Sequence, residues 1–230
     1  MPAENNEYGF VPTLSSQAGS CLTMANWEAA GIRTVAYRLD DLMMKPGQDA
    51  LENLDDIRSY SAWKGQIVLN ASLPPPNREG IYRFRSVYDG AWIRLDRPTL
   101  YKLVAQLKPD RVILPEGSDG YYQGDLSLAD FHQLAERMPC LVESDRPAQD
   151  AVSGLVYSEG ACLSILDQQM AQAHQVIEAA CQCPTCSQQF TRAYLHHLLQ
   201  HTPLLAQRYL VQHNCYYVQQ LLSRFHLRRP

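Results

Sequence analysis

Three cysteines stand close together near the C-terminal end of the sequence, at Cys181, Cys183 and Cys186. In a Cys-x-Cys-x-x-Cys arrangement, a short turn through Pro184 and Thr185 brings the sulfur atoms to one side. Three thiolates and a histidine form a closed tetrahedral zinc site. Because four protein ligands leave no position for water, such a zinc ion would hold the fold together rather than perform chemistry.

Several histidines follow the cysteines and could supply the fourth ligand: His196, His197, His201 and His213. The first three of them lie within two helical turns of one another, so spacing alone leaves all four open. The alternative to a metal site is a group of buried free cysteines. Three cysteines within six residues favour the metal site.

The other cysteines and the distribution of apolar residues indicate the cellular compartment. The chain has seven cysteines, an odd number, and those outside the cluster lie in apolar contexts at Cys21, Cys140, Cys162 and Cys215. This usage suits a reducing compartment better than a disulfide framework. No run of about 18 apolar residues occurs, and the N-terminal segment is acidic and polar, unlike a targeting peptide. The sequence therefore predicts a cytoplasmic protein that does not span a membrane.

Charge is distributed unevenly along the chain. The net charge is −4, but the stretch from Ala179 to Pro230 contains five arginines and no Asp or Glu, which leaves −9 for the remainder. A neutral-to-basic module on an acidic body bears on the choice of partner. The alternative is a helical surface that happens to use Arg and Gln. With 230 residues, 46% of them hydrophobic, the chain can form one large domain, alone or with a small appendage.

Short apolar runs alternate with amphipathic stretches along most of the chain. The pattern predicts strands at 31–37, 66–69, 111–114 and 140–142, and helices at 23–30, 49–59, 99–107 and 127–137. Asp96 and Ser127 begin sequences that are typical of helix caps. Strand–helix alternation with short connections predicts a parallel sheet or a β/α barrel.

Two further regions have distinct patterns. Asp89-Gly90 joins the alternating runs 81–86 and 91–95, which is a strong hairpin signal. From Gln168 onward the pattern turns helical, with helices expected at 193–204 and 205–225 and Pro203 at their junction. We therefore expect a β/α body over residues 1–167 and a helical zinc-binding subdomain over residues 168–230.

The residues around the cysteines resemble one family. The sequence runs Cys181-Gln-Cys-Pro-Thr-Cys186, then Thr191-Arg-Ala-Tyr-Leu-His-His-Leu198, then His213-Asn214. This arrangement is similar to the zinc subdomain of the tRNA-guanine transglycosylases, which are queuine or archaeosine tRNA-ribosyltransferases. In that family the histidine of the His-Asn pair is the fourth ligand. The resemblance therefore implies that Cys181, Cys183, Cys186 and His213 bind a structural Zn²⁺.

The N-terminal half resembles the same family in three places. Leu42–Gly47, Trp63–Asn70 and Phe84–Gly90 are similar to its Leu-x-Leu-Arg-Pro-Gly, Trp-Asp-Gly-Pro-Ile-Leu-Thr-Asp and Phe-Arg-Ser-x-x-Asp-Gly elements. The family fold is a β/α barrel with a zinc subdomain near its C-terminal end. Residues 117–139 are too few for several of the family's middle strands. The resemblance thus implies a reduced or incomplete TIM-like β/α barrel with a C-terminal helical zinc-binding subdomain.

The candidate chemistry departs from the family pattern. Where the family has an aspartate that begins a glycine-rich loop over the base pocket, this chain has Asn70-Ala-Ser-Leu-Pro74, and an amide does not accept a proton at neutral pH. Glu116 falls where the family has a base-recognising aspartate, and Glu143 where it has the aspartate nucleophile. Each glutamate is one methylene longer than the family's aspartate. The alternative is that both are ordinary acids at strand ends.

The resemblance implies a function that these departures modify. The leading hypothesis is a tRNA- or partner-binding homologue with lost or weak base exchange. It would form a homodimer, or a heterodimer with a full-length relative, through the zinc subdomain. The rival hypothesis is an active minimal tRNA-ribosyltransferase that exchanges a tRNA guanine for a deazaguanine base, with Glu143 as nucleophile and Glu116 and Asn70 at the base. A third hypothesis is a binder of free modified base.

Overall fold

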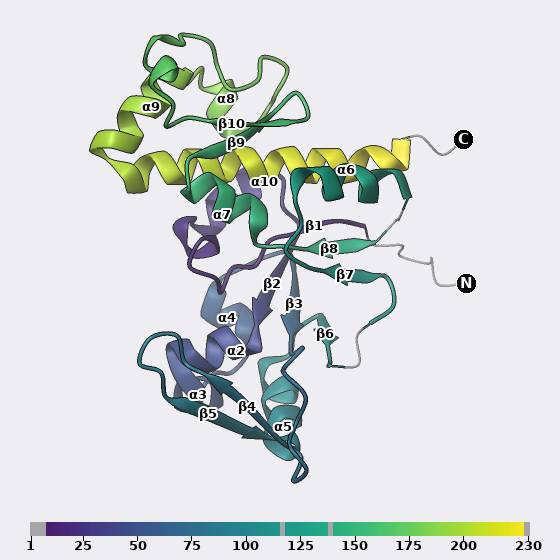
Figure 1. The fold of residues 1–230 in the computed structure, drawn as a ribbon. Helices are drawn as coiled ribbons and strands as arrows, with labels where there is room; N and C mark the ends of the chain where they lie inside the picture. Colours follow the sequence, from purple (N-terminus) through teal and green to yellow (C-terminus); the bar gives the residue numbers. More distant parts are fainter. Residues whose placement is uncertain (1–7, 116–117, 138–139, 228–230) are drawn as a thin grey trace. The chain divides into compact units, whose positions relative to one another are not determined.

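The computed structural model describes residues 8–115, 118–137 and 140–227. Contacts divide the chain into two compact units (Figure 1). Unit 1 comprises residues 1–12, 17–33 and 120–230, and unit 2 comprises residues 13–16 and 34–119. None of the helices in the described part of the chain combines the length and apolarity needed to cross a bilayer.

Unit 2 contains a parallel sheet and a hairpin. Its strands are β2 (Thr34–Arg38), β3 (Gln66–Asn70), β4 (Ile81–Arg85), β5 (Trp92–Asp96) and β6 (Arg111–Ile113). Its helical segments are α2 (Leu39–Leu42), η2 (Met43–Gly47), α3 (Gln48–Glu52), α4 (Ile57–Ser61) and α5 (Arg97–Leu107). The sheet order is β2-β3-β6, and both pairs are parallel. Near-continuous burial along β2 and β3 is typical of a parallel strand covered on both faces.

Local chemistry fixes the ends of α5. Asp96 is its N-cap and accepts a hydrogen bond from the backbone N–H of Thr99 (2.8 Å). Proline occupies the first turn, where no N–H partner is required. Leu100, Leu103 and Leu107 recur at helical spacing and are buried. The cap predicted at Asp96 is confirmed.

Unit 1 is built around the long C-terminal helix. Its strands are β1 (Gly9–Val11), β7 (Tyr121–Gln123), β8 (Leu141–Glu143), β9 (Leu155–Ser158) and β10 (Ala161–Ser164). Its helical segments are η1 (Gly19–Cys21), α1 (Met24–Ala29), α6 (Leu128–Arg137), α7 (Arg146–Val152), η3 (Gln168–Gln172), α8 (Pro184–Ser187), α9 (Arg192–His201) and α10 (Pro203–Leu227). Parallel pairing gives the sheet order β1-β8-β7, and β9 and β10 form an antiparallel hairpin.

Helix α10 is the centre of unit 1. It contacts α6, α7, α8, α9 and β9 (Figure 1). Residues 210–215 are all buried, so this turn of the helix is covered on every side. A polar side chain placed here requires a partner inside the protein, and His213 and Asn214 lie in this turn.

Several sequence predictions are confirmed and two are wrong. The β4–β5 hairpin, the reciprocal cap between Ser127 and Asp130, and the break between α9 and α10 occur as expected. The single helix expected at 49–59 is wrong. It is two short helices, because Asp56 accepts the N–H of Ser59 (2.6 Å) and starts a new one. Residues 173–183 are irregular rather than helical.

The overall class is mixed α/β, as predicted. Each unit contains its own three-stranded parallel sheet, while barrel closure and the boundary between residues 167 and 168 stay predictions. The irregular segment before α8 is held by side chains instead of a helical hydrogen-bond ladder. Arg192 donates to the carbonyl oxygens of Val176 (3.1 Å) and Ile177 (2.6 Å), and Ser158 donates to Ile177 O (3.0 Å).

Candidate metal centre

The three cysteines are positioned by backbone N–H groups. Cys183 is the N-cap of α8, and its Sγ accepts a hydrogen bond from the N–H of Cys186 (3.3 Å). The Sγ of Cys181 accepts in turn from the N–H of Cys183 (3.4 Å). Thr185 donates to the carbonyl oxygen of Tyr209 (2.7 Å), which fixes α8 on α10. The turn expected from Pro184 and Thr185 is therefore the first turn of α8.

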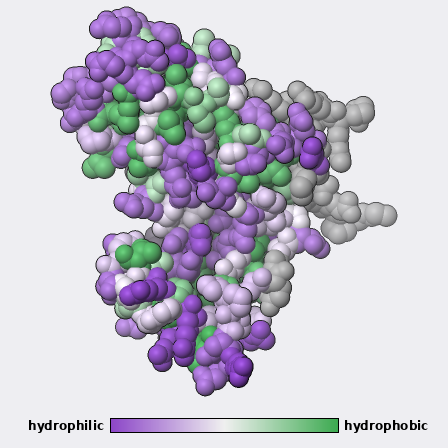
Figure 2. Space-filling view, in the orientation of Figure 1, coloured by the Kyte–Doolittle hydropathy of each residue, from purple (hydrophilic) through white to green (hydrophobic). Residues whose placement is uncertain are grey.

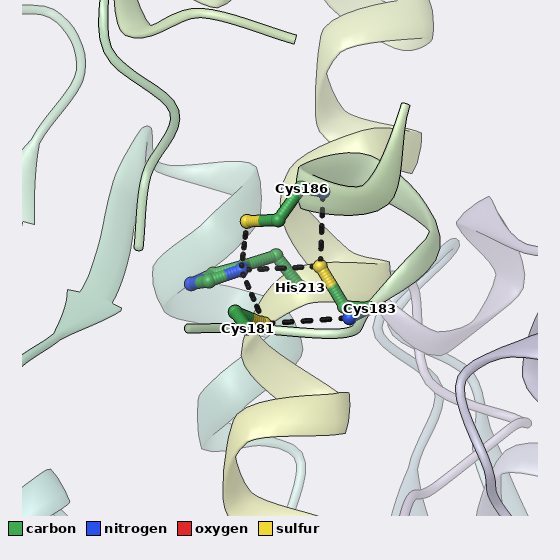
Figure 3. Close-up of side chains that lie close together, drawn as sticks. All are labelled: Cys181, Cys183, Cys186 and His213. Atoms are coloured by element: carbon green, nitrogen blue, oxygen red, sulfur yellow. Dashed lines mark hydrogen bonds between the residues drawn. The ribbon is translucent and has the colours of Figure 1, made fainter. Parts of the chain in front are cut away.

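The four predicted ligand atoms converge. The Sγ atoms of Cys181, Cys183 and Cys186 lie 3.8, 3.4 and 3.4 Å from Nδ1 of His213. All four atoms lie within 4.8 Å of one another, and the side chains point inward from α8, the segment before it and α10 (Figure 3). With Zn–S near 2.3 Å and Zn–N near 2.0 Å, a regular tetrahedron would have S–N edges of about 3.5 Å. The observed spacing fits that geometry.

The second nitrogen of His213 is already used. Nε2 lies 2.7 Å from the carbonyl oxygen of Tyr157 in β9. A carbonyl only accepts, so Nε2 carries the proton and the lone pair of the neutral ring is on Nδ1, facing the sulfur atoms. A ligating histidine characteristically donates its other N–H in this way. Because His213 is 0% exposed, this hydrogen bond also satisfies a fully buried donor.

The other histidines are engaged elsewhere. His196 is buried, with Nδ1 2.7 Å from the carbonyl oxygen of Ile165 and Nε2 2.9 Å from the amide nitrogen of Gln200. Both of its ring nitrogens thus have partners. His197 and His201 lie one turn apart and their rings contact each other, with centroids 4.4 Å apart and planes tilted by 43°. Only His213 of the four candidates belongs to the convergent group.

The four groups perturb one another's protonation. Hydrogen bonds from Cys181 and Cys183 hold the pKa of Cys186 far below its ordinary 9.0. Hydrogen bonds with Cys181 and Cys186, together with burial, hold the pKa of Cys183 far above 9.0. Burial lowers the pKa of His213, but hydrogen bonds to Cys181 and Cys186 outweigh it and raise the pKa to about 10. The cluster therefore pairs a thiolate on Cys186 with a protonated His213, and a divalent cation would stabilise the thiolate forms of the cysteines and displace the imidazole proton.

Asn214 links three elements around the centre. Its Oδ1 accepts the N–H of Tyr157 (3.0 Å), and its Nδ2 donates to the carbonyl oxygens of Pro147 (3.1 Å) and Leu155 (3.0 Å). His213 and Asn214 thus hold the two backbone groups of Tyr157. The Tyr157 hydroxyl donates to Asp150 (2.8 Å), and both burial and that carboxylate raise the pKa of Tyr157. Neighbouring positions on α10 therefore fix β9 and α7 beside the cysteines.

A small cavity adjoins the cluster. It has a volume of about 220 Å³ and is lined in part by Glu178, Cys181, Tyr216 and Tyr217. The carbonyl oxygen of Glu178 accepts the N–H of Cys181 (3.2 Å). Within residues 8–115, 118–137 and 140–227, Oε2 of Glu178 is buried without a hydrogen-bond partner. Glu178 therefore touches the cluster through its backbone rather than through its carboxylate.

Comparison with known proteins identifies the region around this centre. The family model described as queuine tRNA-ribosyltransferase matches residues 140–227. This part of the chain is similar to the queuine tRNA-ribosyltransferases, and the matches support a divergent, shortened relative of that family. The queuine tRNA-ribosyltransferase of Rickettsia bellii strain RML369-C is 30% identical over 118 residues, and that of Lachnoclostridium phytofermentans is 27% identical over 124 residues. These alignments cover 51% and 54% of this chain. The chain spans only 32% of the length of either relative.

Glu143, the predicted counterpart of the transglycosylase nucleophile, ends the central strand of a parallel sheet. It is 4% exposed, and the hydroxyl of Tyr121 donates to its Oε2 (2.6 Å). Val11 and Gln123 flank it in register on β1 and β7. The carboxyl ends of parallel strands are where ligands bind in many α/β folds. Its role in catalysis stays a prediction.

Of the other two predicted transglycosylase site residues, the structure describes one. Asn70 ends β3 in unit 2, is 6% exposed, and accepts the N–H of Ser72 with its Oδ1 (3.0 Å). This is an Asx turn, which an aspartate would form equally well. Glu116 lies outside the described residues. The roles of both at a base stay predictions.

Sequence reasoning missed the residues that orient the ligands. Tyr157 supplies the carbonyl that fixes His213, yet it lies 56 positions away in the sequence. Nothing in its local pattern marks it, because it acts through its backbone. Asn214 belongs to the His-Asn pair of the family pattern, and its position beside His213 was the available signal. Tyr121 donates a hydrogen bond to Glu143, and nothing in the sequence beyond the adjacent Tyr122 indicated a role for it.

Proposed function

We propose that this chain is a zinc-binding, tRNA-binding homologue of the queuine tRNA-ribosyltransferases in which base exchange is lost or weak. The observation that carries the proposal is the contrast between two sites. The Cys₃His group has ligand geometry and a fixed histidine tautomer. Of the positions where the family places its carboxylates, two hold an amide and a buried, hydrogen-bonded glutamate.

Zinc is the metal that the donor set favours. Three thiolates and one imidazole are a borderline-soft set that suits tetrahedral Zn²⁺. Cys181, Cys183, Cys186 and His213 would hold the ion and close its coordination. When bound, the ion would cross-link α8 to α10. Its four protein ligands would leave no open coordination position. Its proposed role is therefore to hold this part of unit 1 together.

Loss of base exchange follows from the surroundings of the candidate carboxylate. A nucleophile must reach the ribose, but Glu143 is nearly fully buried and its Oε2 accepts a 2.6 Å hydrogen bond from Tyr121. A charge-assisted hydrogen bond of this length stabilises the carboxylate and reduces its tendency to donate electrons. Asn70 does not act as a general base. The proposed fold is an incomplete β/α barrel, which would leave the remaining base contacts unformed.

One observation favours the second candidate, an active minimal tRNA-ribosyltransferase. Glu143 lies at the carboxyl end of a parallel strand, where barrel enzymes place catalytic groups. In that case Glu143 would attack the ribose carbon, with the tRNA guanine as leaving group and a deazaguanine as its replacement. Transfer of labelled guanine into tRNA, by the wild-type chain and by Glu143→Gln, separates the two candidates. Turnover that disappears in Glu143→Gln supports the active enzyme.

The proposed partners are tRNA and a second protomer. The relatives are named for their action on tRNA, and we extend tRNA binding to this chain. Dimerisation, with itself or with a longer relative, is proposed through α9 and α10. Its support is a set of exposed apolar side chains there: Tyr194 (43%), Leu204 (79%) and Leu205 (39%). Light scattering after size exclusion tests it, and a monomer for the wild-type chain at micromolar concentration contradicts self-association.

A further inference from the structure

The β4–β5 hairpin of unit 2 has one buried and one open face. The residues that face the core are Tyr82 (2%), Phe84 (8%) and Leu95 (2%). Side chains alternate along a strand, so the residues between them point the other way and are exposed. We call this open face the arginine ribbon, and it consists of Arg83, Arg85, Trp92 and Arg94. Figure 2 shows strongly hydrophilic residues where Figure 1 draws this hairpin.

The register places like charges against each other. Arg83 lies directly opposite Arg94, and Arg85 directly opposite Trp92. Like charges at directly paired positions destabilise a hairpin. Among the residues that the structure describes, none of these three arginines forms an ion pair. Asp96 ends the same face, but its carboxylate caps α5. The ribbon therefore holds positive charge that the described part of the fold does not neutralise.

Trp92 adds a flat apolar surface to this charge. It is 64% exposed, whereas Trp27 and Trp63 are 0% and 1% exposed. Exposure of an indole costs hydrophobic free energy, which a ligand with a flat face would recover. Because a guanidinium group lies opposite the indole, a ligand with both a negative charge and a flat face fits this surface. Unpaired nucleotides offer both, because phosphates pair with arginine and bases stack on aromatic rings. Paired bases in an A-form helix do not present their faces.

We propose that the arginine ribbon binds an unpaired segment of RNA, with phosphates on Arg83, Arg85 and Arg94 and a base on Trp92. This inference rests on the proposed binding of tRNA and assigns a surface to it. Arg83 and Arg85 are two positions apart on one strand, about 6.7 Å, so each can contact a separate phosphate. The ribbon belongs to unit 2, whereas the Cys₃His group belongs to unit 1. RNA contact here does not depend on the metal.

The first test measures tRNA affinity across a salt series by fluorescence anisotropy. The ribbon variant is Arg83→Gln/Arg85→Gln/Arg94→Gln. Its control, Arg33→Gln/Lys64→Gln/Arg137→Gln, removes the same charge from exposed residues that form no ion pair among the described ones. Each lost phosphate contact lowers the slope of log K against log salt by about 0.7 to 1. We expect the ribbon variant to bind roughly tenfold or more weakly with a slope lower by about 2 to 3, and the control to bind nearly as the wild type does.

The second test measures the fluorescence of Trp92. Because the other two tryptophans are buried, the accessible part of the fluorescence comes from Trp92. Single-stranded oligouridine should quench it by stacking, whereas heparin, a polyanion without bases, should not. Trp92→Leu should abolish the quenching and weaken oligouridine binding severalfold. Arg94→Gln removes the like-charge pair without affecting the core, and it should fold normally while it weakens binding.

The outcomes separate the inference from the function on which it rests. Equal tRNA affinity and slope for wild type, ribbon variant and control overturn the ribbon while tRNA binding stands. Absence of tRNA binding by the wild-type chain at low salt overturns both. Equal binding and equal quenching by heparin and oligouridine mean that an acidic partner of another class fits the ribbon, and they also overturn the assignment to RNA.

Discussion

Nε2 of His213 lies 2.7 Å from the carbonyl oxygen of Tyr157, while Nδ1 of the same ring faces three sulfur atoms at 3.4 to 3.8 Å. One imidazole therefore joins β9 to the cysteine cluster. The backbone carbonyl holds a proton on Nε2, so Nδ1 is the nitrogen that faces the cluster and offers its lone pair when a cation displaces its proton. This is the arrangement expected of a preorganised metal ligand.

Loss of one cysteine should release the metal and destabilise unit 1. We expect Cys183→Ser to lower zinc content well below one per chain. If zinc is present at about a thousandfold over its dissociation constant, its binding stabilises the fold by about 4 kcal/mol. Its loss should then lower the melting temperature by roughly 8 to 16 °C. The exposed Cys162, changed to Ser, is the matched control. Equal zinc content by mass spectrometry in both variants would contradict the site.

The choice of histidine can be tested separately. His213→Asn should weaken zinc binding by at least about tenfold, because it removes a ligand. His196→Asn should retain zinc, since both nitrogens of His196 bond within the protein. Competition with a chromophoric chelator gives both affinities. Loss of zinc from His196→Asn with retention in His213→Asn would reverse the assignment.

Asn214 should matter for stability out of proportion to its size. Asn214→Ala leaves the N–H of Tyr157 and two carbonyl oxygens without their partner in a buried place. Unmet buried groups cost about 1 to 3 kcal/mol each, and we expect a total loss of roughly 3 kcal/mol in the free energy of unfolding. Asn53→Ala removes one exposed hydrogen bond to Asp49 and should cost less than about 0.5 kcal/mol. Urea unfolding measures both, and equal effects would refute the role assigned to Asn214.

Stability should depend on pH through the cap of α5. Hydrogen bonds from the side chain and backbone of Thr99 lower the pKa of Asp96 below its ordinary 3.8. Because the folded pKa is lower than the unfolded one, the carboxylate stabilises the fold above the unfolded pKa. That contribution is lost as the pH falls through the folded pKa. Asp96→Ala should therefore reduce stability at pH 7 and reduce it less at pH 3. The exposed Asp55→Ala is the control, and a loss for Asp96→Ala that is equal at both pH values would exclude the charge as its source.

Local signals in the sequence located much of the fold. The cap at Asp96, the Asp89-Gly90 turn and the break at Pro203 each depend on a few adjacent residues, and each occurs as predicted. The β9–β10 hairpin was missed although it has a related signal. Glu159 and Gly160 both have positive φ (52° and 79°), as a type I′ turn requires, but glutamate rarely occupies the first position.

Contacts between residues far apart in the sequence could not be predicted from local patterns. Strand β1 pairs with β8 across more than a hundred residues, and each is three residues long, too short to show alternation. At the centre, spacing left four histidines open, and only the family resemblance selected the one that converges on the sulfur atoms. The carbonyl of Tyr157 carries no side-chain signal, so its contact with His213 required the fold.

The central claim is that a metal-binding scaffold persists where base exchange is lost or weak. Transfer of labelled guanine into tRNA by zinc-loaded chain tests it most directly, with Glu143→Gln and Cys162→Ser measured in parallel. The account predicts tRNA binding with little or no transfer, and the same low level in both variants. Robust turnover that Glu143→Gln abolishes and Cys162→Ser preserves would contradict it and establish Glu143 as a nucleophile.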